Sequence, residues 1–474
     1  MAATDAPIPD LRGRADACAD RLRAADRVLL VSHIDADGLT SAAIASSALA
    51  RASIDHRVVF EKQLDDDAIA GIAARDHEVV LFTDFGSGQL DAIATHETRG
   101  DFVPVIADHH QPADADTRYH LNPLLEGIDG ASELSGAGAS YVLARALEGP
   151  AVDNRDLAAL AVVGAVGDMQ DGGGGLVGAN EAIVADGVDA GVLESRTDID
   201  LYGRQTRPLP KLLEYASDVR IPGISGDEAG AIRFLRGVDV DATDDDGDWR
   251  RWVDLTDAEQ QTLASALIRR AVSSGVPADR VDALVGTSYT LLDEAVGTAL
   301  RDVSEFSTLL NATARYDRAD VGLAVCLGDR DAALEEAHRL LRSHRRNLSE
   351  GLQWVKTEGV TDEPNLQWFD AGSRIRETIV GIVAGMAASS SAVDRGKPVV
   401  AFAEASDVEL KVSARGTGLL VRRGLDLSVV MRDASRAVGG DGGGHDVAAG
   451  ATIPAEARDA FLERANALVG DQLS

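Results

Sequence analysis

Seven acidic and histidine side chains in the first 170 residues have the types and spacing to bind divalent metal ions. They are His33, Asp35, Asp37, Asp84, Asp108, His109 and Asp168. In an extended segment, residues i, i+2 and i+4 share a face, so the first three would present two carboxylates and an imidazole to one side. Oxygen and nitrogen donors favour Mn²⁺ or Mg²⁺ over a thiolate-bound zinc. The set exceeds the needs of one ion, which favours two ions about 3.5–4 Å apart that share a carboxylate.

The elements that must position these side chains are three buried strands. Apolar, β-branched runs at Arg27–Val31, Val79–Phe82 and Phe102–Ile106 precede the three main clusters, and helix-like segments separate them. This pattern predicts parallel strands of an α/β sheet. Ligands of such sheets gather beyond the carboxyl ends of the strands, so we expect the clusters to meet at one edge.

Each cluster taken alone has an ordinary structural explanation. An Asp-x-Asp-Gly sequence is usually a turn, and Asp84 could cap the helix that follows it. Asp168 could simply end its helix, and a His-His pair is more often a surface or core feature than a ligand. It is the occurrence of the clusters at three successive strand ends that favours a metal site.

The composition indicates a salt-adapted protein of a reducing compartment. The net charge is −32 and the pI about 4.6, and only five of the 46 basic residues are lysines. Scarce lysine and excess acid are typical of salt-accumulating halophiles, where molar salt shortens the Debye length to about 3 Å and screens repulsion from polyanions. Two isolated cysteines fit a cytoplasmic location. We expect no membrane association, because no apolar run reaches the roughly 18 residues of a span.

The chain is expected to contain three regions. Residues 1–190 would form the α/β domain, 191–345 a mostly helical region, and 346–474 a second α/β domain. The last region contains a glycine-rich segment, Gly439–His445, whose backbone N–H groups could approach a phosphate without obstruction from Cβ atoms.

These motifs together resemble the DHH phosphoesterase superfamily. The resemblance lies in His33-Ile-Asp-Ala-Asp-Gly38, Asp84, Asp108-His-His110 and Gly167-Asp168, in that order. Lys411-Val-Ser-Ala-Arg415 and Gly442-Gly-Gly-His445 are similar to the DHHA1 domain that accompanies it. The whole chain is most similar to archaeal RecJ-like single-strand exonucleases, a group that includes proteins associated with the GINS replication complex, and the composition adds a halophilic archaeon as the expected source. Residues 227–345 contain stretches that do not match this group.

The resemblance implies a role for each residue. One ion would be held by His33, Asp35 and Asp84, and the other by Asp37, Asp84, His109 and Asp168. Asp108 would orient an imidazole, and His110 would face the scissile phosphate. The substrate would be bound in the C-terminal domain by Ser413, Arg415, Gly442, Gly443, Gly444 and His445.

The sequence therefore predicts a metal-dependent exonuclease acting on single-stranded DNA or RNA in replication or repair, with two divalent cations, most readily Mn²⁺. One alternative is a replication-fork scaffold bound to GINS, with secondary nuclease activity. A second is a phosphodiesterase for short oligoribonucleotides or cyclic dinucleotides. An inorganic pyrophosphatase is disfavoured, because there the first motif spaces its histidine four residues from the first aspartate, and here the spacing is two. Polarity, DNA or RNA preference and oligomeric state stay open.

Overall fold

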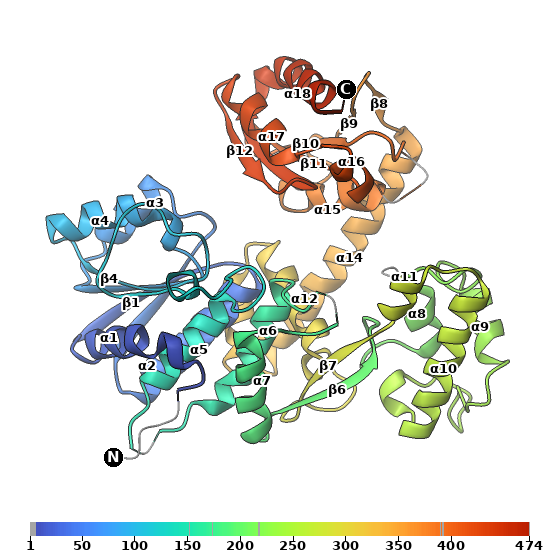
Figure 1. The fold of residues 1–474 in the computed structure, drawn as a ribbon, viewed down its shortest axis with the longest axis horizontal. Coiled ribbons are helices and arrows are strands. Elements are labelled where there is room, and N and C mark those ends of the chain that lie inside the picture. The colour runs from blue at the N-terminus through green and yellow to red at the C-terminus, as the bar shows by residue number, and fades with distance from the viewer. Residues whose placement is uncertain are drawn as a thin grey trace. The chain divides into compact units, whose positions relative to one another are not determined.

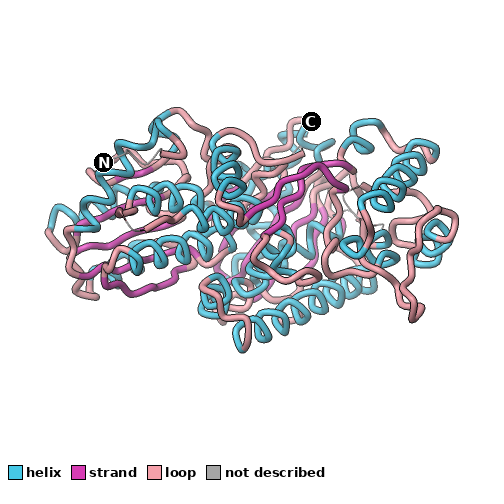
Figure 2. The backbone as a smooth tube through the Cα atoms, turned by 90° about the horizontal axis from the view of Figure 1, so that it is seen from below, coloured by secondary structure: helices cyan, strands magenta, loops and turns pink. Residues whose placement is uncertain are grey.

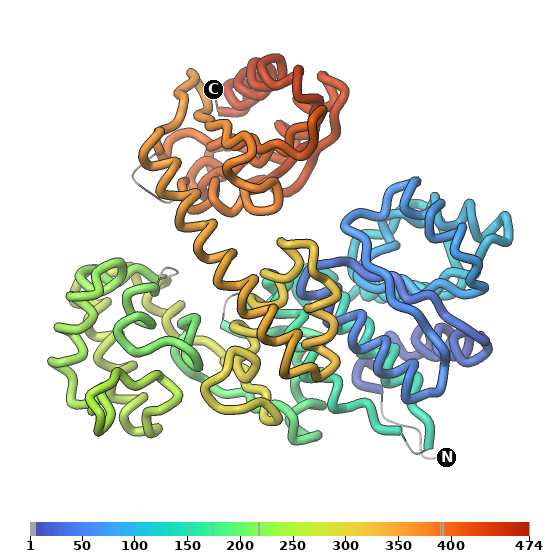
Figure 3. Tube along the Cα trace, turned by 180° about the vertical axis from the view of Figure 1, so that it is seen from behind, coloured from blue at the N-terminus to red at the C-terminus, as the bar shows by residue number. Residues whose placement is uncertain are grey.

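The structure is a computed structural model that describes residues 6–150, 152–172, 174–216, 219–388, 390 and 393–473. Figure 1 shows the order of the elements along the chain. The fold contains two compact units, Met1–His338 and Arg339–Ser474. The boundary falls inside α14 (Ala332–Glu358), which is one continuous helix in the trace of Figure 3.

The N-terminal unit is built on a parallel sheet of five strands in the order β2-β1-β3-β4-β5. The strands are β1 (Arg27–His33), β2 (Asp55–Glu61), β3 (Val79–Thr83), β4 (Val103–Ala107) and β5 (His120–Leu121). All five residues of β3 are buried, as expected for a parallel sheet covered on both faces. The predicted α/β class and its parallel sheet are confirmed.

Helices cover both faces of this sheet (Figure 1). They are α1 (Arg12–Arg23), α2 (Ala36–Arg51), α3 (Asp66–Ala73), α4 (Leu90–Arg99) and α5 (Gly136–Ala146). Two further helices lie outside this layer: α6 (Ala158–Gly167) packs against α2 and α5, and α7 (Ala179–Asp189) packs against α6 and β6. Isoleucines and leucines of α3 and α4 share a buried cluster with alternate residues of β1 and β3. The helix α5 packs against both α1 and α2, and all three helices contact the sheet.

The middle of the chain is mostly helical, as predicted, but two strands enclose it. They are β6 (Leu193–Ile199) and β7 (Val285–Leu291), which pair antiparallel over their full lengths and run side by side in Figure 2. Between them, α8 (Leu209–Glu214), α9 (Glu228–Leu235), α10 (Asp257–Ser273) and α11 (Ala278–Asp282) surround a separate apolar core that contains Trp252. The helices α12 (Val303–Ala314) and α13 (Ala319–Cys326) follow.

The C-terminal unit holds a mixed sheet of six strands in the order β12-β13-β11-β10-β9-β8. Its strands are β8 (Thr361–Asp362), β9 (Gln367–Asp370), β10 (Val399–Glu404), β11 (Glu409–Arg415), β12 (Asp441–Gly444) and β13 (Ala448–Pro454), and its further helices are α15 (Glu377–Ala388), α16 (Gly418–Arg422), α17 (Leu427–Arg436) and α18 (Arg458–Leu473).

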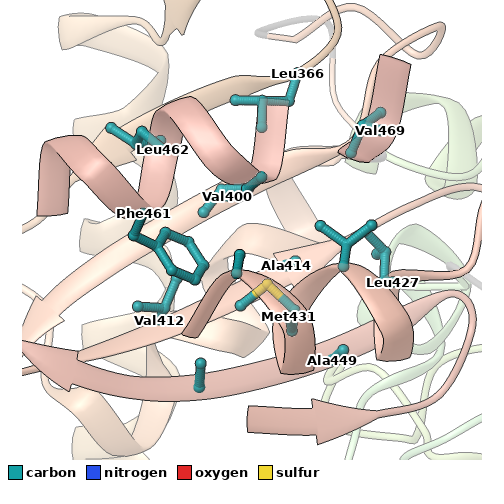
Figure 4. Packing of buried hydrophobic residues seen from close by; sticks show 14 of the residues in the cluster. Leu366, Val400, Val412, Ala414, Leu427, Met431, Ala449, Phe461, Leu462 and Val469 are labelled. Carbon is teal, nitrogen blue, oxygen red and sulfur yellow. The ribbon is translucent and has the colours of Figure 1, made fainter. Parts of the chain in front are cut away.

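Two apolar layers hold this second sheet. On one face, Phe461 of α18 and Met431 of α17 pack onto Val412 and Ala414 of β11, as Figure 4 shows. On the other face, α15 and Val355 of α14 cover β9 and β10. The predicted C-terminal α/β domain is confirmed. Among the described residues, none of the helices combines the length and the hydropathy that crossing a bilayer requires.

Candidate metal centre

Three parallel strands end at one level and deliver the first candidate ligands. Ser32 at the end of β1 is in register with Thr83 of β3, and Thr83 with Ala107 of β4. The next residues along these strands are His33, Asp84 and Asp108. The parallel register therefore brings side chains from three separate segments to one edge of the sheet, where α/β proteins bind ligands.

The carboxylate of Asp84 lies between two imidazoles. Its Oδ2 is 3.6 Å from Nδ1 of His33, and its Oδ1 is 3.4 Å from Nε2 of His109. Asp35 Oδ2 lies 3.1 Å from the same nitrogen of His33. On the other side, His109 Nε2 is 3.8 Å from Asp37 Oδ2. One aspartate thus faces two neighbouring sets of donor atoms, which is the arrangement of a bridging ligand.

The first motif reaches this geometry differently from the extended segment that its spacing predicted, and that part of the prediction is wrong. The strand ends at His33, and α2 already begins at Ala36, so Asp37 is not part of an extended segment. Asp35 caps the helix, since its Oδ1 accepts a hydrogen bond of 3.0 Å from the backbone N–H of Gly38. Asp37 therefore lies in the first helical turn. Gly38 is required because a Cβ there would lie 2.2 Å from the carbonyl oxygen of His33.

Asp37 is held by the N-terminus of another helix. Its two carboxylate oxygens accept hydrogen bonds from the backbone N–H groups of Gly136, at 2.7 Å, and Ala137, at 2.9 Å, in the first turn of α5. These N–H groups have no partner inside the helix, and the helix dipole favours a negative charge here. The residue is 2 % exposed, so this contact, rather than solvent, sets the orientation of the carboxylate.

Asp84 has an unusual backbone conformation. Its φ is 61°, in the left-handed region, where few residues other than glycine are found. Its N–H donates to the carbonyl oxygen of Ala107 on β4, which extends the pairing of the strands by one residue. A Cβ at Gly136 would lie 2.4 Å from Asp84 Oδ1 and 2.9 Å from its Cα, so glycine at 136 makes room for the carboxylate.

His109 has one ring nitrogen committed and the other available. Its Nδ1 lies 2.7 Å from the carbonyl oxygen of Gly130. A carbonyl only accepts, so Nδ1 carries a proton. Nε2 is then the ring nitrogen that faces Asp84 and Asp37, and it is the atom that would bind a cation. The side-chain amide of Gln170 donates to this same carbonyl oxygen and to Asp168 Oδ2, both at 2.9 Å. Gln170 therefore positions Asp168 beside His109.

Asp108 is buried, and both of its carboxylate oxygens are occupied by hydrogen bonds, including one that fixes the ring of His110. Its Oδ1 accepts from the Nδ1–H and the backbone N–H of His110, at 2.8 and 3.2 Å, and its Oδ2 accepts from the backbone N–H of Ser87. Burial alone would raise the pKa of Asp108, but hydrogen bonding from His110 outweighs it and lowers the pKa to about 2. The ring of His110 is 56 % exposed, with its Nε2 edge directed away from Asp108.

The pKa values show that the carboxylates crowd one another. Burial, followed by repulsion from Asp84 and Asp168, raises the pKa of Asp37 well above its ordinary value. Burial also raises the pKa of Asp168, to about 6. Burial disfavours the charged form of His33, yet hydrogen bonds with Asp35 and Asp84 raise its pKa to about 11. Excess negative charge of this kind is what a divalent cation would neutralise.

The donor atoms form three groups whose members lie within 4.8 Å of one another. The groups are His33 with Asp35 and Asp84, Asp37 with His109 and Asp168, and Asp84 with Asp108, His109 and His110. The first group has the three residues of one predicted ligand set. The second group has three of the four residues of the other predicted set, and Asp84, the fourth, is grouped with His109 in the third group. The donor set, the fixed ring orientation of His109 and the crowded carboxylates all fit a pair of divalent cations.

Sequence comparisons place this arrangement in a family. Three family models match the chain: the DHH family N-terminal domain at residues 27–165, the DHH-CID domain at 201–285 and the DHHA1 domain at 371–471. An uncharacterized protein of Methanocaldococcus jannaschii is 30% identical over 455 residues, which are 94% of both chains.

The chain belongs to the DHH–DHHA1 superfamily.

Solved structures share the fold of this DHH–DHHA1 protein. RecJ of Thermus thermophilus in complex with Mn²⁺ is 19% identical, with a TM-score of 0.60, and the match covers 98% of this chain but 55% of RecJ. Exonuclease RecJ bound to manganese has a TM-score of 0.58 at 19% identity, with 98% and 96% of the chains covered. CDC45 of Entamoeba histolytica has a TM-score of 0.62 at 12% identity, covering 98% and 97%. At these identities the likeness concerns the fold.

The predicted substrate residues lie on neighbouring strands of the DHHA1 domain. Ser413 of β11 is in register with Gly450 of β13, and Gly450 with Gly443 of β12. Directly paired residues face the same side of a sheet. Gly450 and Gly443 therefore lie on the same face as Ser413, on the next two strands. A Cβ at Gly443 would meet nothing within 4 Å, so the backbone is open there. The glycine segment is an edge strand here rather than a turn.

Arg415 lies on the same face, two residues after Ser413. A Cβ at Gly381 of α15 would be 2.6 Å from its Nη2, so the guanidinium packs against the glycine-lined side of that helix. Gly442 and Gly444 face the opposite side, where a Cβ would meet backbone atoms of Met431 and Ala449. His445 is exposed, and its N–H donates to the carbonyl oxygen of Ala448. None of these residues belongs to the metal centre of the DHH domain.

Several supporting residues were not predicted from the sequence. Gln170, Gly130 and Ser87 position ligands through the bonds above, and Asn122 donates to Ser87 Oγ and to the carbonyl oxygen of His110. Apart from the bond between Gln170 and Asp168, these contacts join residues that are between 12 and 40 positions apart along the chain. A polar side chain just after Asp168 is the weak signal that could have indicated Gln170; Ser87 and Asn122 carry no such signal.

Proposed function

We propose that this protein is a metal-dependent exonuclease that hydrolyses phosphodiester bonds of single-stranded DNA or RNA. The observation that carries the proposal is the Asp84 carboxylate, which has one oxygen facing His33 and the other facing His109. A structural ion pair needs one partner, whereas a buried aspartate between two separate donor sets is suited to two cations. Membership of the DHH–DHHA1 superfamily supports a phosphoester hydrolase.

In this proposal one cation would be held by His33, Asp35 and Asp84, and the other by Asp37, Asp84, His109 and Asp168. Mixed oxygen and nitrogen donors favour Mn²⁺, with Mg²⁺ as the alternative, and RecJ structures contain Mn²⁺. When bound, two such ions lower the pKa of a water molecule and neutralise charge on a phosphate under attack.

His110 would act on the scissile phosphate. The bond from its Nδ1–H to buried Asp108 fixes the ring, so the exposed Nε2–H can donate to a non-bridging oxygen. Asp108 contributes through this ring, and its remaining bonds from Ser87 and the backbone of His109 hold it rigid. No covalent nucleophile from the protein is required.

In the DHHA1 domain, we propose that Ser413, Arg415 and the open backbone at Gly443 bind the terminal nucleotide. Arginine can bind a phosphate through two parallel N–H donors, and a strand without side chains lets a phosphate approach backbone N–H groups. Gly442, Gly444 and His445 would shape this edge of the sheet.

The decisive test is Asp84→Asn with 5′- and 3′-labelled single-stranded DNA and RNA in molar KCl, with Mn²⁺ or Mg²⁺. We expect wild-type protein to shorten strands from one end, and the variant to lose at least about a thousandfold in kcat, because a group that stabilises transition-state charge is removed. The control Asp67→Asn, in the exposed first turn of α3, keeps wild-type activity. Metal-dependent hydrolysis by the Asp84 variant at the wild-type rate would refute the proposal.

The same assay separates the alternatives. Cleavage confined to dinucleotides or cyclic dinucleotides would favour the small-substrate phosphodiesterase. A replication-fork scaffold bound to GINS would be favoured by co-purification with that complex together with negligible turnover. The ligand set around Asp84 supports hydrolysis over a purely structural role, since a scaffold does not need eight potential ligands gathered at one sheet edge.

A further inference from the structure

A groove in the C-terminal unit lies outside both sets of predicted site residues. It has a volume of about 350 Å³ and is formed by the second half of α14, the loop after β9 and the start of α15. The residues that matter in its lining are Asn347, Trp354, Arg374, Ile375, Arg376 and Ile379. All of them belong to the unit that begins at Arg339.

The groove lies in a basic part of an acidic protein. The chain has 78 acidic and 46 basic residues, yet residues 338–347 of α14 contain four arginines and no acid. Arg374 and Arg376 add two exposed guanidinium groups from the loop. Glu350 is the one carboxylate among the lining residues. Positive charge concentrated against the net charge of the chain indicates a negatively charged ligand.

An aromatic ring sits beside these cations. Trp354 is half-buried and lines the groove. Its indole contacts Phe369 of β9 edge-on, with ring centroids 6.1 Å apart and planes at 69°, and Phe369 is itself buried in the core beneath α15. The ring is therefore anchored from below and partly accessible. Ile375 and Ile379 extend the apolar floor.

We propose that this groove binds a segment of single-stranded nucleic acid, with a base stacked on Trp354 and phosphates paired with Arg374 and Arg376. An aromatic ring next to arginines is the combination that recognises unpaired bases on a charged backbone. A duplex has its bases stacked internally and offers none to Trp354. This inference rests on the proposed nuclease function and adds a contact region for the strand beyond its terminal nucleotide.

The test measures binding without hydrolysis. Full-length protein in EDTA is titrated into a fluorescently labelled 20-nucleotide single strand, as DNA and as RNA, and anisotropy is recorded. Arg374→Glu is compared with Arg464→Glu, which makes the same charge change at an exposed position of α18 on the other face of the sheet. Trp354→Leu and Trp354→Phe test stacking.

We expect Trp354→Leu to weaken binding roughly five- to hundredfold, the range for loss of one stacked base. Arg374→Glu should weaken binding by roughly the same factor, because it removes a phosphate contact and places a negative charge beside the backbone. Trp354→Phe keeps most of the affinity, and Arg464→Glu stays within about twofold because a distant charge is screened. Arg374→Ala lowers the slope of log K against log salt by about 0.7, the value for one phosphate contact on a single strand. Hydrolysis of a dinucleotide is unchanged by all of these variants.

The groove assignment is overturned if Arg374→Glu and Arg464→Glu bind the strand equally, and this result stands even if Trp354→Leu does not fold. The outcome is independent of the nuclease proposal. If strand binding depends on Arg374 but the protein shows no turnover, the exonuclease proposal is refuted and the groove assignment stands. If turnover is normal but the Arg374 variants bind the strand as tightly as wild type, the groove assignment is refuted and the exonuclease proposal stands.

Discussion

Asp84 satisfies two requirements in a single residue. It adopts a left-handed backbone conformation, and its buried carboxylate faces His33 and His109 at once. Burial alone would raise the pKa of Asp84, but hydrogen bonding with the two histidines lowers it below its ordinary value. A non-glycine residue in a sparsely populated region costs about 1–3 kcal/mol and persists where the surroundings demand it. Here the left-handed conformation allows one carboxylate to face both His33 and His109.

Asp171 lies three residues after Asp168 and is not one of the candidate metal ligands. Its carboxylate can therefore be used to test how burial of a charge affects the stability of the fold. Burial raises its pKa from 3.8 to about 6. A folded-state pKa above the unfolded value means that the ionised form destabilises the fold above pH 6, and that this penalty disappears as the pH falls below 3.8.

We therefore expect Asp171→Asn to raise the free energy of unfolding at pH 8 by up to about 3 kcal/mol, and to leave it unchanged at pH 3.5. Urea denaturation at the two pH values measures the difference. Asp189→Asn, at the exposed end of α7, serves as the control. An equal effect of Asp171→Asn at both pH values would show that charge burial is not the cause.

Among the elements, the N-terminus of α5 makes two separate contacts with the candidate metal centre. Its first-turn N–H groups hold Asp37, and the absence of a side chain at Gly136 admits Asp84. The helix α12 makes a second connection: Asn311 Oδ1 accepts from the N–H of Ala36, between two candidate ligands. Asp302, which caps α12, pairs with Arg204 of the middle region. Packing of helices thus sets where the first motif lies.

Gly136→Ala should disrupt the candidate metal centre, because residue 136 lies directly against Asp84. The added Cβ would lie 2.9 Å from the Asp84 backbone, so the helix or the loop must move. We expect destabilisation of about 1–3 kcal/mol, together with loss of Mn²⁺ binding in calorimetric titration. Gly71→Ala in α3, where a Cβ would meet nothing within 4 Å, should instead stabilise by about 0.5–1 kcal/mol. Normal Mn²⁺ affinity in Gly136→Ala would contradict the packing argument.

For the whole molecule, the net charge of −32 sets the response to salt. Self-repulsion destabilises a compact state that carries so many like charges. The Debye length falls from about 10 Å at 0.1 M to about 3 Å at 1 M ionic strength, which screens that repulsion.

Thermal unfolding should therefore shift upward between 0.1 and 2 M KCl, by at least the roughly 2–4 °C that corresponds to 1 kcal/mol in a large domain. Sucrose at equal osmolality is the control, because it acts by exclusion from the surface and leaves charges unscreened. Equal shifts in KCl and sucrose would mean that screening of the acidic surface is not what stabilises the fold.

The sequence alone determined the strands of the DHH sheet and the identity of the residues at their ends. Local apolar runs specify buried strands, and a parallel register then brings His33, Asp84 and Asp108 to one edge whatever the rest of the chain does. The motif set also indicated the superfamily, which the comparisons confirm.

The tertiary structure decided how the first motif and the supporting residues are placed, because their placement depends on contacts between residues far apart in the chain. The hydrogen bonds that hold Asp37 span about 100 residues, and β6 pairs with β7 across an intervening helical core. Local spacing suggested an extended first motif, but capping by Asp35 and the N-terminus of α5 favoured a helix starting at Ala36. Only the packed fold shows that Gln170 positions Asp168 and that Trp354 lies beside Arg374 and Arg376.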